Sequence, residues 1–376
     1  MKIDGVEVRV IGPSVRRYTW SYDLPQQYMT NTLVRIHTDE GVEGLAGISN
    51  YTSHDFDRYT AETIRHLIPD LLGMDPLQQE AIAHRLRPRV FPITPAAMAV
   101  VDIALWDLLG KIAGLPIYQL LGGARDRILS YASTPLLPDV PAYLRFVDEL
   151  IEQGFRAIKF HTWCMPDRDL ELARAVRQHH PGKEVAFMLD AENNYDRASA
   201  LRVASELESL EFNWFEAPLP DYDLDGYREL TSRVRIPILP SGNWIQDLPS
   251  LADALRKHTW TAARTDVTVC GGITAARKAM ALVEAAGMNC EIMSWGFTLI
   301  SAANLHLMLA FHNCTYYEQA VPYEAYEYGM KDVIRTQPDG YVAAPQGPGL
   351  GVEVDWRAME AATIHTLSAG KWARDK

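Results

Sequence analysis

The sequence predicts an α/β protein in which a barrel of parallel strands and outer helices carries an α+β domain as a cap. Two observations lead to this fold class. From about residue 128 onward, eight short apolar runs alternate with seven amphipathic segments of helical length. Short apolar strands suit a parallel sheet that is covered on both faces. Before that point strand-like runs come first and helical segments follow, which is typical of an α+β unit.

The amino-terminal part is expected to form three strands and three helices. Alternating apolar residues predict the strands, over 3–11, 32–38 and 42–48. Helical spacing of apolar residues predicts the helices, over 56–72, 75–86 and 95–113. Pro76 lies near the start of the second helix, and Gly114 and Pro116 end the third.

The second part is expected to close into a modified TIM barrel of the (β/α)7β kind. Its strands are predicted over 128–132, 157–161, 185–190, 213–217, 236–239, 263–267, 289–293 and 315–318. Its helices are predicted over 141–153, 167–179, 196–210, 222–233, 247–256, 273–286 and 298–311. We therefore expect a domain at 1–125, a barrel at 126–320 and a tail at 321–376 that finishes with one helix.

Composition excludes several classes of protein. The chain has 376 residues, of which 36 are Lys or Arg and 48 are Asp or Glu, so its net charge is −12. An acidic surface argues against nucleic acid and anionic membranes as partners. No apolar run is long enough to span a membrane, the first residues do not resemble a signal peptide, and the four cysteines form no CxxC pair. We expect a cytoplasmic protein with free thiols.

Polar residues lie at or just after the ends of successive barrel strands. They are Lys159 and His161, Asp190, Glu216, Asn243, Asp266 and Glu318. Together with Met293, which closes the seventh strand, these positions recur about 23 to 31 residues apart, the length of one βα unit. They should therefore converge on the carboxyl-terminal mouth of the barrel. Asp190, Glu216 and Asn243 form a set of oxygen ligands that suits Mg²⁺ better than zinc. Alternatively, each carboxylate caps the helix that follows its strand.

Several longer segments resemble the enolase superfamily, in its mandelate racemase-like subgroup (the mandelate racemase/muconate lactonizing enzyme family). The segments are 96–127, AIKFH at 157–161, MLDAENNYD, WFEAPL, RTDVTVCGGITAARK and 340–355. The resemblance covers almost the whole chain. It implies that the first part and the tail together form a capping domain over the barrel.

The resemblance also implies a reaction. Mg²⁺ binds a substrate carboxylate, a base removes the proton α to it, and the metal stabilises the resulting enediolate. Lys159 matches the base, and Asp190 and Glu216 match metal ligands. The aromatic segments at 17–22 and 50–54 match the loops that cover the substrate, so Arg17, Tyr18, Trp20 and His54 are candidate substrate-binding residues. The partner is then a small carboxylate, and we expect a homo-oligomer.

Four positions depart from the family pattern. His161 replaces the second Lys of Lys-x-Lys, and Glu192 replaces the Asn of Asp-x-Asn. Asn243 replaces the Glu that supplies the third ligand, and Met293 replaces the His that pairs with Asp266. A thioether cannot transfer a proton, so the His–Asp dyad is absent and Met293 becomes a candidate substrate contact.

These departures favour a one-sided elimination over a two-base racemisation. The leading hypothesis is dehydration of an acid sugar or related hydroxy acid, which makes the chain a carbon–oxygen lyase. An epimerase or cycloisomerase is the alternative, and a barrel that has lost catalysis is a third. We expect Lys159 to be partly neutral through desolvation or the charge of His161, and Glu318, if protonated, to donate a hydrogen bond to the enediolate.

The departures at Glu192 and Asn243 can be interpreted together, as the transfer of one carboxylate from position 243 to position 192. Two carboxylates and an amide carry a formal charge of −2, and Glu192 restores −3 close to Asp190. Residues i and i+2 of a strand point to the same side. Glu192 therefore either ligates the metal, supports a ligand, or acts as an acid or base while the amide of Asn243 ligates.

Overall fold

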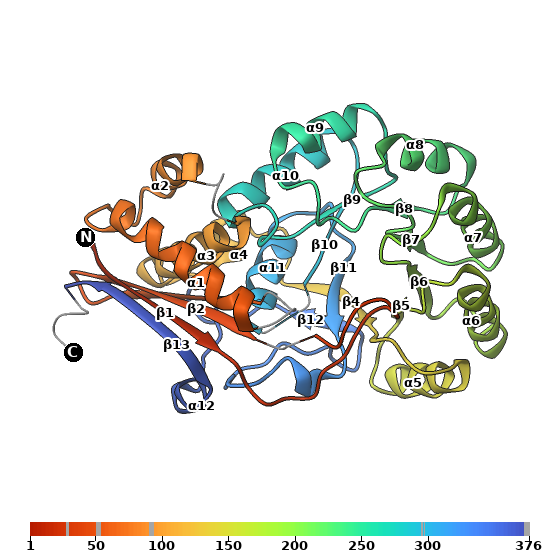
Figure 1. Ribbon diagram of the computed structural model, residues 1–376, viewed down its shortest axis with the longest axis horizontal. Helices are drawn as coiled ribbons and strands as arrows, with labels where there is room; N and C mark the ends of the chain where they lie inside the picture. Colours follow the sequence, from red (N-terminus) through yellow and green to blue (C-terminus); the bar gives the residue numbers. More distant parts are fainter. Residues whose placement is uncertain (28–29, 50–53, 90–93, 295, 297, 372–376) are drawn as a thin grey trace.

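Eight parallel strands form the barrel in the computed structural model, which describes residues 1–27, 30–49, 54–89, 94–294, 296 and 298–371 (Figure 1). The strands are β4 (Arg127–Ser133), β5 (Ala157–His161), β6 (Ala186–Asp190), β7 (Trp214–Glu216), β8 (Ile238–Leu239), β9 (Ala263–Thr265), β10 (Cys290–Ile292) and β11 (Tyr316–Ala320). The outer helices are α5 (Val140–Glu152), α6 (Pro166–His179), α7 (Arg197–Ser209), α8 (Leu224–Arg233), α9 (Leu248–Arg256), α10 (Ile273–Ala285) and α11 (Thr298–Ala310). The predicted order of strands and helices is confirmed.

The barrel strands pair in two groups. Six of them follow the order β11-β4-β5-β6-β7-β8, and β9 pairs with β10. Backbone hydrogen bonds just before the strands connect the groups, from Thr261 N to Ile238 O (3.1 Å) and from Cys290 N to Asn313 O (2.7 Å). The register places His161 opposite Asp190, and Asp190 opposite Glu216. Three chemistry-bearing residues are therefore neighbours at one end of the sheet.

The capping domain is built on an antiparallel sheet in the order β13-β1-β2-β3. These strands are β1 (Ile3–Ile11), β2 (Asn31–Thr38), β3 (Glu43–Ile48) and β13 (Thr363–Gly370). The helices are α1 (His54–Leu71), α2 (Gln79–Leu86) and α3 (Pro95–Ala113). Figure 1 shows β13, from the end of the chain, lying beside β1 at the start of it.

The tail corrects one expectation. It does not finish with a helix, because the short α12 (Trp356–Ala361) is followed by β13. The strand forms because its backbone pairs with β1, from Gly5 opposite Gly370 to Ile11 opposite Thr363. Two short elements lie outside the predicted set, α4 (Ile117–Leu120) and β12 (Tyr341–Ala343), the second of which pairs with β4. The tail thus completes both domains.

Helix α3 joins the two domains. Thr94 caps its start by accepting a hydrogen bond from Ala97 N, and Gly114 ends it in a left-handed conformation (φ 68°). Its buried polar side chains bind the neighbouring elements. Asp102 Oδ2 accepts from Thr274 N (2.9 Å), and Asp107 accepts from Leu45 N and Leu350 N (both 2.8 Å).

A histidine of α11 makes a similar connection. Tyr118 N donates to His306 Nδ1 (3.3 Å), and His306 Nε2 donates to Leu350 O (3.0 Å). His306 is therefore a packing residue that links α11 to α4 and to the tail. We call Asp102, Asp107 and His306, with the groups they bind, the seam.

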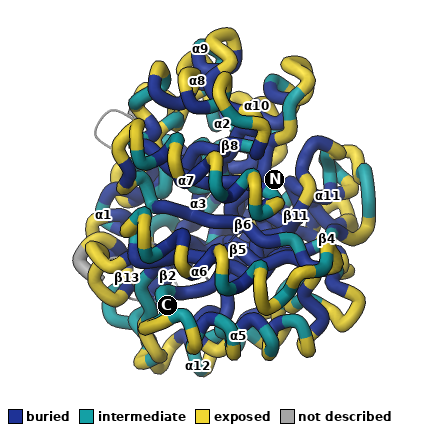
Figure 2. Tube along the Cα trace, turned by 90° about the vertical axis from the view of Figure 1, so that its right-hand side faces the viewer, coloured by how far each residue is buried: buried dark blue, intermediate teal, exposed yellow. Residues whose placement is uncertain are grey.

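Burial follows the layers of the fold. The barrel strands β5 to β11 are almost wholly buried, and the outer helices α5 to α10 expose one face, whereas α11 is buried along nearly its whole length (Figure 2). Among the described helices, none combines the length and the apolar character that crossing a bilayer requires.

Candidate active site

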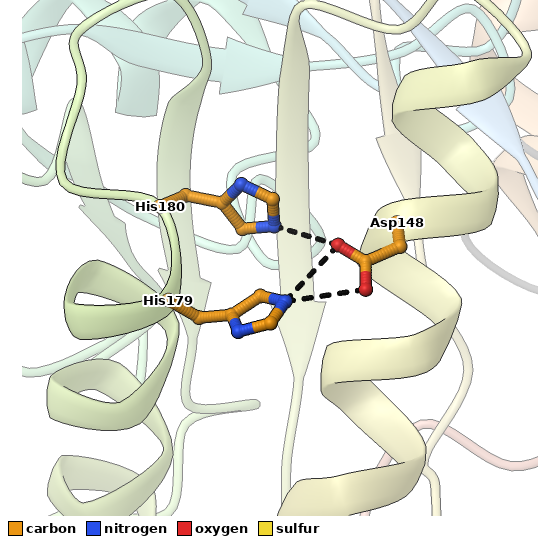
Figure 3. A group of neighbouring side chains, drawn as sticks. All are labelled: Asp148, His179 and His180. Atoms are coloured by element: carbon orange, nitrogen blue, oxygen red, sulfur yellow. Dashed lines mark hydrogen bonds and ion pairs between the residues drawn. The ribbon is translucent and has the colours of Figure 1, made fainter.

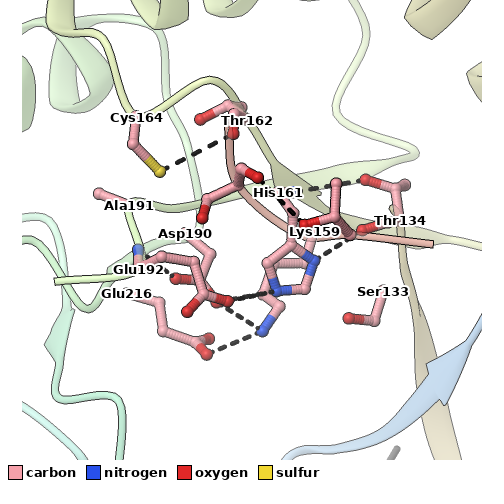
Figure 4. Close-up of polar contacts among 12 residues, drawn as sticks. Ser133, Thr134, Lys159, His161, Thr162, Cys164, Asp190, Ala191, Glu192 and Glu216 are labelled. Carbon is pink, nitrogen blue, oxygen red and sulfur yellow. Dashed lines mark hydrogen bonds and ion pairs between the residues drawn. The ribbon is translucent and has the colours of Figure 1, made fainter. Parts of the chain in front are cut away.

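Six charged or titratable side chains meet at the carboxyl-terminal end of the barrel strands. They are Lys159, His161, Asp190, Glu216, Arg264 and Glu318, which we call the mouth cluster, and all are buried. Five of them were predicted, and β5, β6, β7 and β11 position them as expected. Figure 4 shows four of the six, together with Glu192 and Cys164.

Lys159 lies at the centre of the mouth cluster. Its Nζ donates to Asp190 Oδ2 (2.9 Å) and Glu216 Oε1 (2.7 Å) and lies 3.1 Å from Glu318 Oε1. An ammonium group has three protons, so these three carboxylates occupy all its donors. The three strands β6, β7 and β11 are thereby tied to β5 through one charge.

Arg264 of β9 is a site residue that sequence analysis missed. Its Nε lies 3.0 Å from Glu216 Oε1, and its Nη2 donates to Glu318 Oε2 (2.9 Å) and to Tyr131 Oη (3.1 Å). No local signal marks it, because β9 ends at Thr265, and Asp266, two positions after Arg264, lies in the turn and not in the cluster. Arg264 bridges two carboxylates that Lys159 also binds.

His161 sits at the edge of the cluster. Its Nδ1 donates to the carbonyl of Thr134 (2.6 Å), which leaves Nε2 facing Asp190 Oδ2 (3.2 Å) and Glu192 Oε1 (3.3 Å). Burial and Lys159 lower the pKa of His161, but the hydrogen bonds to the two carboxylates outweigh them and raise it to about 9. The ring of His161 is therefore held with Nε2 toward the carboxylates of Asp190 and Glu192.

The charges of the cluster overturn two expectations. Burial lowers the pKa of Lys159, yet the surrounding carboxylates raise it well above its usual value, so this lysine is not partly neutral. Burial raises the pKa of Glu318, but Lys159 and Arg264 together bring it down to about 2. Glu318 is therefore ionised and accepts hydrogen bonds, from Ser133 Oγ (2.9 Å) and Ser294 N (3.2 Å).

The pKa values of the two carboxylates nearest the expected metal position, Asp190 and Glu216, are shifted in opposite directions. Burial raises the pKa of Asp190, but Lys159 and His161 outweigh it and hold that pKa well below its usual value. Burial raises the pKa of Glu216 to about 8, against the lowering effect of Arg264 and Lys159 and with a smaller contribution from the neighbouring carboxylates. Two buried carboxylates on adjacent strands form a donor set of the kind that Mg²⁺ takes, and the residues present fit that ion.

The two candidates for a third oxygen ligand lie in different surroundings. Glu192 has a positive φ of 47°, and its N–H donates to Asp190 Oδ1 (3.0 Å). Its carboxylate forms a group with Asp190 and His161 in which the ligand atoms all lie within 4.8 Å of one another. Asn243 is exposed on the loop after β8, and its backbone contacts Ser241 and Gln246. The arrangement favours Glu192.

Asp266 and Met293 do not join the mouth cluster through any hydrogen bond that the described residues make. Asp266 Oδ1 accepts from Val269 N (2.6 Å) and so holds the turn after β9; burial raises its pKa to about 6. Met293 is buried, and its N–H donates to Thr265 O (3.0 Å). The sulfur side chain thus occupies the interior at the end of β10.

One predicted cap residue reaches the mouth. The rings of Trp20 and His161 meet edge to face, with centroids 6.5 Å apart. Thr19 O accepts from Leu136 N (2.8 Å), which fastens this loop to the barrel. Tyr18 is half-buried and packs with Trp20 against Tyr326.

For the other predicted substrate-binding residues of the cap, Arg17 and His54, no contact with the mouth cluster is seen among the described residues. Arg17 is exposed. His54 is the first residue of α1, its side chain lies outside the described part of the chain, and residues 50–53 lie outside it as well. Cys164, which follows β5, is a free thiol whose pKa burial raises, and its Sγ contacts Thr162 O (3.7 Å).

Comparison with known proteins agrees with the geometry. Residues 142–358 match the family model described as enolase C-terminal domain-like. Residues 19–122 match the model of the mandelate racemase/muconate lactonizing enzyme N-terminal domain.

Three relatives illustrate the similarity. A solved structure from Pseudovibrio sp., described as a mandelate racemase/muconate lactonizing enzyme, is 40% identical over 98% of this chain and 99% of its own, with a TM-score of 0.95. A D-galactonate dehydratase family member from Streptomyces bingchenggensis is 30% identical over 83% of this chain and 85% of its own. The structure of D-glucarate dehydratase from Agrobacterium tumefaciens, solved with magnesium, is 30% identical over 97% of this chain and 100% of its own, with a TM-score of 0.79. Other curated relatives are cycloisomerases, epimerases and racemases.

Proposed function

Because the chain belongs to the mandelate racemase/muconate lactonizing enzyme family of the enolase superfamily, we propose that it is a Mg²⁺-dependent carbon–oxygen lyase. It removes the proton α to the carboxylate of an acid sugar or related hydroxy acid and expels a β-hydroxyl group. The observation that carries the proposal is the mouth cluster, in which an acid–base histidine, two cations and a carboxylate pair meet at the end of the barrel that the cap covers.

Asp190 and Glu216 hold the metal in this proposal, with Glu192 as the third oxygen ligand. Bound Mg²⁺ supplies Lewis-acid stabilisation for the negative charge that develops on the substrate carboxylate. Glu192 is preferred to Asn243 because its carboxylate already lies beside Asp190 and carries the charge that the amide lacks.

The acid–base role is assigned to His161 rather than to Lys159. All three donors of Lys159 are taken by carboxylates, so this residue acts as a fixed cation that keeps the cluster assembled. His161 has its Nδ1 proton committed to Thr134 O, and its Nε2 proton faces Asp190 and Glu192. Once these two carboxylates bind a metal, Nε2 is the nitrogen that can give up its proton and then accept one from the substrate. Arg264 is the second fixed cation, and Trp20 covers the histidine.

A single acid–base side favours elimination. On the opposite side Met293 stands where a second base would be needed, and Asp266 is committed to a turn. A two-base racemisation lacks its second base there, whereas an elimination needs only one base and an acid for the leaving hydroxyl. Two of the relatives described above have dehydratase names, which supports this reading.

The proposal is tested with a library of hydroxylated carboxylates in D₂O with Mg²⁺. We expect metal-dependent exchange of the α-proton and release of a 2-keto-3-deoxy product. Comparable deuterium incorporation into both α-epimers without loss of water would show an epimerase instead. An isomeric lactone product would show a cycloisomerase, and no exchange with any member of the library would contradict catalysis.

A further inference from the structure

A second group of metal-ligating side chains lies on the outer wall of the barrel, away from the mouth. Asp148 of α5 and the adjacent His179 and His180 of α6 converge there (Figure 3). His179 Nε2 lies 3.2 Å from both oxygens of Asp148, and His180 Nε2 lies 3.0 Å from Oδ1. The three ligand atoms all lie within 4.8 Å of one another.

The end of α6 explains how two consecutive histidines reach one carboxylate. Neighbouring residues of a helix point about 100° apart, so a continuous helix would direct the two rings to different sides. His179 is the last helical residue, and His180 leaves the helix with φ −121° and ψ 79°. The two rings meet at 89° with centroids 4.7 Å apart, and both present Nε2 to α5.

The backbone around His180 is held in place. Arg177 Nη1 donates to His180 O (3.3 Å) and Gly182 O (2.9 Å), and Arg177 Nε donates to Leu210 O (2.8 Å). The His180 ring also packs near Phe187, with centroids 6.2 Å apart. His180 is only 24% exposed in its side chain, whereas His179 is 44% exposed and open to solvent. One ligand is therefore anchored and the site remains accessible.

The site lies at the opposite end of the barrel from the mouth cluster. Helix α6 begins after β5, whose end carries His161, and finishes before β6 begins. His179 and His180 therefore lie toward the amino-terminal ends of the strands. The two groups share no residue.

We propose that Asp148, His179 and His180 form a surface site for Zn²⁺ or a similar transition-metal ion. Two imidazole nitrogens with one carboxylate oxygen suit zinc, with water as the fourth ligand, whereas Mg²⁺ prefers oxygen ligands alone. The ion is held by Nε2 of both rings, and each neutral ring then carries its single proton on Nδ1. The bound ion ties α5 to α6 and strengthens the wall of the barrel.

The test measures Zn²⁺ bound per chain by equilibrium dialysis, with excess Mg²⁺ present to occupy the mouth. The variants are His179→Ala, His180→Ala and Asp148→Asn, and the matched control is His66→Ala, which removes an exposed histidine from α1. We expect each site variant to lose one bound ion per chain, or to bind it at least about tenfold more weakly. The control should bind as the unmodified chain does. We also expect Co²⁺ to give the visible absorption bands of a tetrahedral ion in the unmodified chain and in His66→Ala alone.

Urea unfolding provides the second measurement, since a ligand of the native state raises its stability. Added Zn²⁺ should raise the unfolding midpoint of the unmodified chain and not that of His180→Ala. Zn²⁺ binding that all three site variants retain would overturn the proposal, as would the absence of one bound Zn²⁺ ion per chain in the unmodified protein. Because Mg²⁺-dependent turnover is measured separately, a failure here leaves the proposed lyase activity untouched.

Discussion

The mouth cluster and the seam both bury carboxylates, but they satisfy them differently. In the mouth, Asp190, Glu216 and Glu318 are bound mainly by the side chains of Lys159 and Arg264. In the seam, Asp102 and Asp107 are bound mainly by backbone N–H groups of other elements. Backbone donors hold a structure together, whereas carboxylates that are bound by charged side chains keep lone pairs for a metal or substrate at the mouth.

The comparison predicts different consequences of mutation. Changes in the mouth should reduce turnover more than stability, and changes in the seam should do the reverse. The following variants separate the two regions, in order of decreasing expected effect.

His161→Gln should give the largest change. Removal of the proposed acid–base group is expected to lower kcat by roughly 10²- to 10⁴-fold, because glutamine cannot exchange a proton. Circular dichroism should show an intact fold, and the exposed His258→Gln serves as control. Should α-proton exchange persist in His161→Gln and vanish in Lys159→Gln, the role returns to Lys159.

Asp107→Ala tests the seam. It leaves Leu45 N and Leu350 N without their acceptor and Lys111 Nζ without its partner at 2.7 Å. We expect the free energy of unfolding to fall by about 3 kcal/mol. Substrate turnover by the folded fraction should be unchanged. Asp339→Ala, which removes the exposed pair with Arg127 and an exposed hydrogen bond from Tyr341 N, should cost less than about 1 kcal/mol. Equal losses in the two variants would mean that the seam does not depend on these backbone donors.

Because His306 is buried in the seam, the stability of the protein should depend on pH. Burial lowers the pKa of His306 to about 4, although the hydrogen bond to Leu350 O acts in the opposite direction. Below about pH 6.5 the unfolded chain takes up a proton that the folded chain refuses, so stability falls as pH drops toward 4. We expect this residue to remove roughly 2 kcal/mol at pH 5. The stability difference between the unmodified chain and His306→Gln should narrow by that amount between pH 7 and pH 5. A constant difference would contradict the shifted pKa.

Glu192→Gln should give the smallest change, in the metal affinity of the mouth. Loss of its charge beside Asp190 is expected to weaken Mg²⁺ binding by about tenfold, as measured by calorimetry. Asn243→Ala should leave the affinity nearly unchanged, because Asn243 is exposed. If Glu192→Gln binds Mg²⁺ with unchanged affinity but no longer turns over substrate, Glu192 would have a role in proton transfer and not in metal binding.

Much of the fold could be predicted because its signals are local. The limits of β1, β5 and α3 follow directly from alternation, a short apolar run, and the Thr94 and Gly114 caps. Strand β13 could not be found in this way, because 363–370 becomes a strand only by pairing with β1 at the other end of the chain. Helix α2 begins at Gln79 rather than near Pro76, as local spacing does not mark the loop before it.

In the candidate site, too, some features could be predicted from local signals and others could not. One polar residue per strand end, recurring with the βα repeat, was enough to bring Lys159, His161, Asp190, Glu216 and Glu318 to one mouth, because parallel strands share a direction. The sequence also identified Met293 as a break in the proton-transfer pattern, since residue type alone excludes that chemistry.

Only the tertiary structure decided the charge states and partners at the mouth. Lys159 stays charged and Glu318 stays ionised because three carboxylates and two cations from five different strands share one buried volume. Their balance depends on distances across the barrel that no local pattern encodes. For the same reason Arg264, an ordinary strand residue in the sequence, became a bridge between Glu216 and Glu318, while Asn243 turned outward.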